Sequence, residues 1–234
     1  MKVLVIIPCY NEEKNIQNTV TDLIKNNYDY IIINDGSKDK TLEVIKENNF
    51  NYINLSNNLG IGAAVQTGYK YAYDNNYDIA IQFDGDGQHD VEYIKRIIEP
   101  IKNKKAAMVI GSRFVGNESE FKSTQIRRVG INILSFLLKI FSKKTIKDMT
   151  SGFRAVNREI IEIFARNYPQ EYPEPVTNLI IAKRNFIIEE VSVKMKERKH
   201  GKSSINALKS AYYMFNVILL FIIIILSKGD DINA

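Results

Sequence analysis

The chain has 234 residues, of which 45% are hydrophobic and 25% charged, proportions that are ordinary for a globular protein. This length supports one sizeable core, with room for an appended segment. The formal net charge of +5 permits anionic ligands, whether nucleotides or lipid headgroups. The single cysteine, Cys9, excludes an intramolecular disulfide and adjoins an apolar run, so we interpret it as a small buried residue.

The first half of the chain alternates short apolar runs with amphipathic stretches. Buried strands are predicted at residues 3–8, 30–33, 51–55, 78–83 and 106–111. Helices are predicted after residues 11–13 and at 41–47, 60–73 and 91–101. In the first of these helices one face carries Ile16, Val20, Leu23 and Ile24. Repeated strand–helix units of this length predict an α/β fold, with a mostly parallel sheet and helices on both faces.

The second half is less regular. Residues 126–141 carry a broad apolar stripe with interspersed basic residues, which fits either a core-facing helix or an amphipathic helix in the membrane interface over 125–142. The proline-rich residues 168–175 are predicted as an ordered loop, 186–193 as a strand and 194–202 as a basic loop. A nucleic-acid partner is disfavoured, because the basic residues border apolar segments instead of interleaving with aromatic ones.

The C-terminal part of the chain is strongly apolar. About twenty residues from 207 to 226, at 1.5 Å each, reach roughly the 30 Å of a bilayer's hydrocarbon core. We therefore expect a transmembrane or membrane-anchoring helix over 205–227 and a polar tail over 228–234, although a buried helix would have a similar composition. Basic residues before the segment predict that the domain preceding it lies on the cytoplasmic face. A single span would favour a second copy of the chain or a small membrane protein as partner.

Two carboxylates one residue apart follow the strand predicted at 78–83. Asp84 and Asp86 would emerge at the C-terminal tip of a core strand, where open α/β sheets bind ligands. In an extended segment residues i and i+2 point the same way, so both carboxylates can hold one hard cation, Mg²⁺ or Mn²⁺. Substrate phosphates usually fill the remaining coordination positions. Asp-Gly pairs are also common in solvated turns, and a lone Asp-x-Asp does not separate these two interpretations.

Polar residues also follow two earlier strands, at the same predicted edge of the sheet. A nucleotide needs an apolar or aromatic slot for its base and acceptors for base or ribose hydrogens. Pro8 and Tyr10 can wall a base, and Glu12 and Asp35 can accept hydrogen bonds. Each acid has a purely structural alternative, Glu12 as partner of a helix dipole and Asp35 in an Asx-turn.

Seven motifs, in this order along the chain, resemble those of family 2 glycosyltransferases, in particular the enzymes similar to dolichyl-phosphate mannose synthase and its bacterial polyprenyl-phosphate relatives. The motifs are Pro8-x-Tyr10-Asn11-Glu12, Asn34-Asp35-Gly36-Ser37-x-Asp39-x-Thr41, Asn58-x-Gly60-x-Gly62-x-Ala64, Asp84-x-Asp86-x-Gln88-His89, Gly111-Ser112-Arg113, Asp148-x-x-Ser151-Gly152-Phe153-Arg154 and Arg198-x-x-Gly201-x-Ser203. The resemblance covers nearly all the chain through Ser203.

The resemblance implies a single GT-A (Rossmann-like) catalytic domain over 1–204 and a set of site residues. By the match of motifs, the nucleoside would be held by Pro8, Tyr10, Glu12, Asp35 and the backbone of Ile33. The metal would be held by Asp84, Asp86 and Gln88, so that Asp86 counts among the catalytic residues. Gly85 would lie against the nucleotide, and the phosphates would be bound by Arg113 and Arg198. The implied reaction is an inverting displacement at the anomeric carbon, with Mg²⁺ or Mn²⁺ and the arginines stabilising the departing diphosphate.

The chain departs from the family pattern at three places. Asn34 precedes Asp35 where the family often has two acids. Gly85 and Gly87 replace the more usual alanine and leucine, which makes the acidic loop more flexible. The lysine expected after Gly-x-Ser is Ser204, and Lys202 is the nearby residue that could replace it.

The acceptor decides whether a catalytic base is needed. A phosphate acceptor is already ionised near neutral pH, whereas a sugar hydroxyl needs a carboxylate within hydrogen-bond reach. Asp148 is the first candidate for that base, and Glu174, between two prolines, is the second. We expect a membrane-associated, metal-dependent transfer of a hexose from a nucleotide sugar to a polyprenyl phosphate. The alternatives are a glycosyltransferase acting on a saccharide or lipid-linked saccharide hydroxyl, and a nucleotide-binding subunit without turnover.

Overall fold

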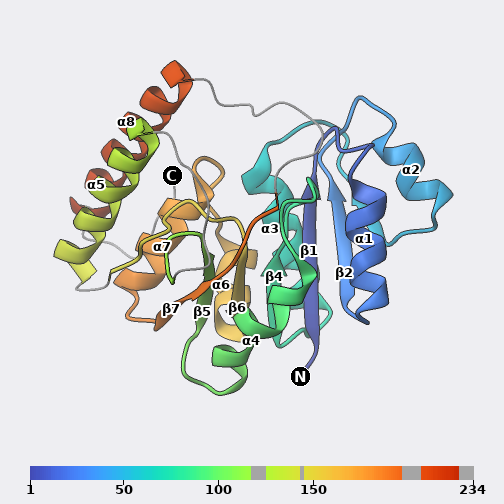
Figure 1. The fold of residues 1–234 in the computed structure, drawn as a ribbon, viewed down its shortest axis with the longest axis horizontal. Coiled ribbons are helices and arrows are strands. Elements are labelled where there is room, and N and C mark those ends of the chain that lie inside the picture. Colours follow the sequence, from blue (N-terminus) through green and yellow to red (C-terminus); the bar gives the residue numbers. More distant parts are fainter. Residues whose placement is uncertain (117–124, 143–144, 197–206, 227–234) are drawn as a thin grey trace.

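The computed structural model describes residues 1–116, 125–142, 145–196 and 207–226. Its centre is a seven-stranded sheet with the order β3-β2-β1-β4-β6-β5-β7 (Figure 1). The strands are β1 (Val3–Cys9), β2 (Asp29–Asn34), β3 (Tyr52–Asn54), β4 (Ile79–Gln82), β5 (Met108–Ser112), β6 (Arg154–Asn157) and β7 (Ile188–Ser192). All neighbouring strands are parallel except that β6 runs antiparallel to both β4 and β5. The predicted α/β fold with a mostly parallel sheet is therefore confirmed.

The helices cover both faces of this sheet (Figure 1). They are α1 (Ile16–Lys25), α2 (Thr41–Glu47), α3 (Ile61–Asp74), the short 3₁₀ helix η1 (Val91–Tyr93), α4 (Ile94–Lys102), α5 (Gln125–Ser142), α6 (Arg158–Arg166), α7 (Pro173–Lys183) and α8 (Ala207–Leu226). Alternate residues of β1 separate the two cores: Leu4 and Ile6 face α3, α6 and α7, whereas Val5 and Ile7 face α1, α2 and α4. Burial of both faces explains why these strands are continuously apolar.

The strands predicted in the first half, and the one predicted at 186–193, are present within two residues at each end. Strand β6 was not predicted. It has only four residues and begins with a fully buried arginine, Arg154, so it lacks the apolar run that marked the other strands. Because β6 is antiparallel, its first residue pairs with Gln82, the last residue of β4. The segment that precedes β6 therefore lies at the edge of the sheet where β4 ends.

Two local predictions are wrong. Ile24 is 47% exposed instead of facing the core, because α1 buries a narrower stripe of Ile16, Val20 and Leu23. The predicted loop at 168–175 ends early, since α7 begins at Pro173 and includes the next proline. The first turn of a helix has N–H groups without helical partners, so proline is tolerated there. This places Glu174 in the first turn of a helix.

Helices α5 and α8 lie side by side at one end of the molecule (Figure 1). Each buries one stripe in the core, with Leu134 and Leu138 on α5 and Val217, Phe221 and Ile224 on α8. Part of the apolar stripe predicted at 126–141 therefore faces the core. Other apolar side chains of the same two helices are exposed: Ile133, Phe136 and Ile140 on α5, and Phe215, Leu219, Ile222, Ile223 and Leu226 on α8.

A helix does occupy the C-terminal stretch, as the sequence predicts. Among the described residues, however, the structure has no helix that combines the length and the apolar character needed to cross a membrane. The transmembrane form of that prediction is thus not found in this part of the chain.

Candidate active site

Three loops meet at one edge of the sheet, as predicted, because β2, β1 and β4 are adjacent. The loop after β2 and the turn after β4 both bond to the end of β1. The Asp35 N–H donates to the Cys9 carbonyl at 2.9 Å, and the Gly85 N–H donates to the Pro8 carbonyl at 3.3 Å. A Cβ at Gly85 would lie 3.1 Å from the Cys9 Cβ. Gly85 thus packs against the end of β1, which leaves little room for the alanine that is more usual at this position.

The residues predicted to hold the nucleoside lie at this edge, and they differ in exposure and in hydrogen bonding. Tyr10 is 40% exposed, so its ring is available to a ligand, whereas Ile33 is fully buried within β2. The Asp35 carboxylate accepts hydrogen bonds from the backbone N–H groups of Leu59 and Gly60, at 2.8 and 2.9 Å. Asp35 therefore fixes the turn that opens α3.

Glu12 also makes hydrogen bonds within the protein. Its carboxylate accepts a hydrogen bond from the Asn15 amide at 2.7 Å, and its backbone N–H donates to the Thr41 hydroxyl at 2.8 Å. Carboxylates held in place by hydrogen bonds are pre-oriented acceptors, so these contacts are compatible with a nucleoside nearby.

The acidic motif is a turn instead of an extended segment. Strand β4 ends at Gln82, and Gly87 has φ = 77°, a left-handed conformation that favours glycine. Within this turn the Gln88 N–H donates to the Asp86 carboxylate at 3.0 Å. Asp84 and Asp86 therefore do not belong to an extended strand, and the strand alternation on which the prediction was based does not apply to them. Asp86 lines a cavity of about 130 Å³ on the side of α1, together with Thr19 and Lys196.

Asp84 lies against the segment that precedes β6. A Cβ at Gly152 would come within 2.9 Å of the Asp84 Oδ2, so only glycine permits this approach. Burial in the cleft, and then the neighbouring Glu174 carboxylate, raise the pKa of Asp84 to about 6, although its side chain remains 37% exposed. The Gln82 amide and Arg154 act in the opposite direction. A carboxylate with a raised pKa beside a second carboxylate indicates a site that a cation would stabilise.

His89 fixes the orientation of Asp84, a role that the motifs alone did not assign. Its Nδ1 accepts the backbone N–H of Asp84 at 3.0 Å, and its Nε2 lies 3.6 Å from the Asp84 Oδ2. The ring stacks on Phe153, with centroids 4.8 Å apart, and contacts Phe83 edge-on. Burial lowers the pKa of His89 to about 4, so the ring is neutral and carries its proton on Nε2.

The two candidate bases have contrasting surroundings. Glu174, at the first turn of α7, accepts a hydrogen bond from the Gln82 amide at 3.4 Å and faces the cleft beside Asp84. Asp148 is fully buried, and both of its carboxylate oxygens bind the Arg113 guanidinium, at 2.7 and 2.8 Å. The Arg113 backbone N–H also donates to Asp148, at 2.9 Å. This geometry argues against Asp148 as a base, because no oxygen of it is presented to an acceptor.

A second buried arginine, Arg154, holds the backbone of Glu174 in position. Arg154 is fully buried and donates to the Thr177 hydroxyl at 2.7 Å, to the Ser151 carbonyl and to the Glu174 carbonyl. These bonds connect the start of β6 with the first two turns of α7. These three oxygens accept hydrogen bonds from the N–H groups of the buried guanidinium. Its positive charge stabilises the ionised form of Asp84 in the cleft.

Gln88 connects the acidic turn with the basic segment after β7. The Lys196 N–H donates to the Gln88 carbonyl at 2.8 Å, the Gln88 amide donates to the Lys196 carbonyl at 3.4 Å, and the Lys196 ammonium pairs with Asp90 at 3.1 Å. The chain thus passes the site just before Arg198 and Lys202. Those two predicted phosphate-binding residues lie outside the described residues.

The donor set of the acidic turn fits a hard divalent cation. Asp84, Asp86 and Gln88 offer oxygen ligands, and burial together with the nearby Glu174 carboxylate raises the pKa of Asp84. In the ranges that the structure describes, no group of three or more histidine, cysteine or acidic side chains is arranged to hold a metal. Divalent cations held by few protein ligands usually take substrate phosphates as further ligands.

The fold and this edge of the sheet are those of a GT-A glycosyltransferase, and comparison with known proteins agrees. Residues 4–164 match the family model described as "Glycosyl transferase family 2". The chain therefore belongs to glycosyl transferase family 2, and it is a glycosyltransferase.

Relatives and a solved structure are similar over most of the chain. The UDP-N-acetylglucosamine–dolichyl-phosphate N-acetylglucosaminyltransferase of Methanococcus voltae is 39% identical over 213 residues, which cover 82% of this chain and 84% of that protein. The dolichyl-phosphate beta-glucosyltransferase of Saccharomyces cerevisiae is 31% identical, over 86% of this chain and 69% of that protein. Glucosyl-3-phosphoglycerate synthase of Mycobacterium tuberculosis, in complex with Mn²⁺, UDP-glucose and phosphoglyceric acid, superposes with a TM-score of 0.71 at 16% identity, covering 94% and 79% of the two chains.

Proposed function

We propose that the protein transfers a hexose or N-acetylhexosamine from a uridine-diphosphate sugar to a polyprenyl phosphate, with inversion and with a divalent cation. The observation that carries the donor part is the acidic turn, with Asp84 held at the carboxyl edge of β1, β2 and β4. The acceptor class and the uridine base are supported by the names of relatives that align over most of the chain.

In this proposal the nucleoside lies between the ends of β1 and β2, against Tyr10, Glu12 and Asp35. A Mg²⁺ or Mn²⁺ ion bound by Asp84, Asp86 and Gln88 would neutralise the diphosphate and act as a Lewis acid for its departure. Asp148 holds the Arg113 guanidinium in one orientation and thereby limits where a phosphate can be bound.

The acceptor phosphate needs no base. One of its oxygens forms the new bond to the anomeric carbon, and the bond from that carbon to the diphosphate breaks, so that the diphosphate departs with the electron pair. We assign to Glu174 the binding of sugar hydroxyls, because its carboxylate faces the cleft beside Asp84. Arg198 and Lys202 remain proposed phosphate ligands.

We also propose that the protein associates with the cytoplasmic face of a membrane. The exposed apolar side chains of α5 and α8 form one surface, here called the α5–α8 face: Ile133, Phe136, Ile140, Phe215, Leu219, Ile222, Ile223 and Leu226. Apolar exposure of this extent on two adjacent helices is typical of an interaction surface. The basic segment from 194 to 202 precedes α8, and it would lie near anionic headgroups. A second copy or a small membrane protein would contact the same end of the molecule.

One observation favours transfer to a sugar hydroxyl as the second candidate function. Glu174 is a cleft-facing carboxylate beside the acidic turn, where a general base would be needed. The variant Glu174→Gln separates the candidates. A loss of kcat of about 10³-fold in Glu174→Gln, with a pH profile that loses its acidic limb, would indicate a base and hence a hydroxyl acceptor.

The experiment that tests the proposal is transfer in detergent with Mn²⁺, from a panel of radiolabelled nucleotide sugars to undecaprenyl phosphate. We expect one UDP-sugar to give a labelled lipid that mild acid cleaves. The assignment of a polyprenyl phosphate as acceptor would be overturned by a different result: no lipid product, together with Mn²⁺-dependent donor hydrolysis that is lost in Asp86→Ala. A labelled lipid formed only from a guanosine or thymidine donor would overturn the choice of base.

A further inference from the structure

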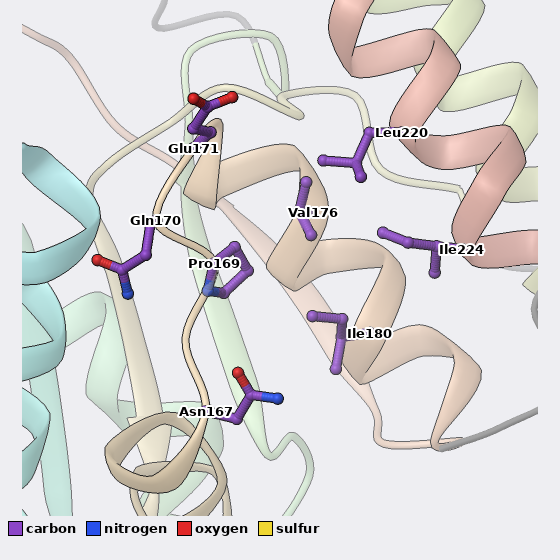
Figure 2. Close-up of a pocket in the computed structure, with 8 residues that line it drawn as sticks. All are labelled: Asn167, Pro169, Gln170, Glu171, Val176, Ile180, Leu220 and Ile224. Carbon is purple, nitrogen blue, oxygen red and sulfur yellow. The ribbon is translucent and has the colours of Figure 1, made fainter. Parts of the chain in front are cut away.

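A cavity of about 350 Å³ lies between α7, α8 and the loop that joins α6 to α7. This volume is within the range of small-molecule sites, about 300–1,000 Å³. Its wall is mainly apolar: Val176 and Ile180 face it from α7, Leu220 and Ile224 from α8, and Pro169 from the loop, while Asn167 is a polar lining residue (Figure 2). The polar ends of Gln170 and Glu171 lie at its border and point away from these side chains (Figure 2). We refer to it as the α7–α8 pocket.

The pocket and the acidic cleft lie on opposite sides of the first turn of α7. Glu174 faces the cleft, and Val176, two residues on, is turned by about 200° around the helix. A helix with its side chains is about 10–12 Å across, so a ligand in the pocket lies about one helix width from the cleft. A molecule with an anionic head and an apolar chain could thus place its head at the acidic turn and its chain in the pocket.

The pocket and the α5–α8 face share helix α8. Leu220 and Ile224 line the pocket, while Leu219 and Ile223, their neighbours on the same helix, are exposed on that face. An apolar chain that reaches the pocket from a membrane interface would therefore have apolar side chains of α8 beside it. The Asn216 amide donates to the Tyr172 hydroxyl at 3.1 Å and fixes α8 to the start of α7. This bond satisfies the side chain of Asn216, a polar residue that would be costly in an apolar environment.

We propose that the α7–α8 pocket binds the phosphate-proximal isoprene units of the lipid acceptor. The proposal rests on the proposed function, because it takes the acceptor to be a polyprenyl phosphate. Branched, flexible isoprenoid chains match a wall of branched aliphatic side chains, and burial of their methyl and methylene groups provides the affinity. The phosphate remains outside the pocket, at the cleft, so the pocket positions the acceptor and takes no part in the chemistry.

The first test compares two substitutions that introduce the same side chain at different places. Leu220→Trp fills the pocket, whereas Ile24→Trp adds a tryptophan to an exposed position of α1, which covers the opposite face of the sheet. We expect Leu220→Trp to raise the KM for undecaprenyl phosphate about tenfold, a change of about 1.4 kcal/mol, and to leave the KM of the nucleotide sugar unchanged. Ile24→Trp should change neither constant by more than about twofold. Equal acceptor KM values in the two variants would overturn the proposal.

The second test uses the unaltered protein and does not depend on the folding of a variant. A farnesyl phosphate that carries a diazirine on its chain is photolysed with the protein in the presence of Mn²⁺ and UDP, and the adducts are mapped by mass spectrometry. Adducts within 167–183 and 215–226 support the pocket; adducts confined to 125–142 overturn it. If the protein transfers sugar to undecaprenyl phosphate and Leu220→Trp has no effect, the proposed function holds and the assignment of the pocket is wrong. Absence of transfer to any lipid phosphate removes the proposed function, and the pocket assignment with it.

Discussion

The two halves of the sheet form their share of the site by different means. On the side of β2, β1 and β4, loops are fixed by bonds that involve backbone groups: N–H groups donate to carbonyls at the end of β1, as at Asp35 and Gly85, and to side chains such as that of His89. On the side of β6, β5 and β7, buried charged side chains hold the loops in place, above all the Asp148–Arg113 pair. Backbone geometry tolerates many sequences, whereas a buried ion pair depends on both partners. We therefore expect substitutions to act locally on the first side and to affect folding on the second.

The largest effect on catalysis should come from the acidic turn itself. Asp84→Asn removes a charge from the proposed metal site, and we expect kcat/KM to fall by about 10³-fold with little change in Tm. Asp90→Asn, in the same turn, keeps the capping oxygen of its side chain and should retain activity within about twofold. Steady-state kinetics over a range of Mn²⁺ concentrations measure both. A kcat/KM for Asp84→Asn within tenfold of the unaltered enzyme would contradict the assignment of the metal site.

The opposite behaviour is expected at Asp148. Asp148→Asn leaves the Arg113 guanidinium buried without its counter-charge, which costs about 3 kcal/mol of unfolding free energy, or a fall in Tm of roughly 6–12 °C. Glu162→Gln, which breaks an exposed pair with Arg166, is the control and should leave Tm unchanged. Thermal unfolding monitored by circular dichroism decides between them. Similar Tm values for the two variants would remove the contrast between the halves.

Gly152 connects the two halves, since its Cα lies against the Asp84 carboxylate. Gly152→Ala would displace that carboxylate, and a displacement of about 1 Å can cost about 10²-fold in rate. Its φ is outside the left-handed region, so the alanine backbone is unstrained and the stability should be preserved. Activity and Tm measured on one preparation separate the two effects. A fall in Tm that accounts for the whole loss of activity would mean that the glycine serves packing only.

The smallest of these effects is expected at His89. His89→Phe keeps the stack on Phe153 but leaves the Asp84 N–H without its acceptor, so we expect the Mn²⁺ concentration for half-maximal activity to rise about tenfold. His89→Asn restores an acceptor and should recover part of that affinity. Were both variants to bind Mn²⁺ equally well, His89 would serve packing and not the orientation of Asp84.

The sequence predicts the first side of the sheet better than the second, for a physical reason. Apolar runs and Gly or Asp turns determine β1, β2 and β4 locally, so their ends could be placed at one edge. Strand β6 could not be found this way, because Arg154 starts it and its partners are distant in the chain. Nor could the pairing of Asp148 with Arg113 be predicted, although both belonged to recognised motifs. Gly152 and His89 belong to recognised motifs, so the sequence marks both residues. Their contacts with Asp84 could be seen only in the folded structure.

The position of β6 in the sheet, between β4 and β5, has a consequence for how the protein folds. Gln82 and Arg154 are paired neighbours although η1, α4, β5 and α5 all lie between them in the chain. Closing so long a loop is entropically costly and slow, whereas β1 and β2 are consecutive strands. We therefore expect the loops after β1 and β2 to be ordered before the cleft between β4 and β6 is complete. During synthesis, a nascent chain that ends before β6 would have only half of its active site formed.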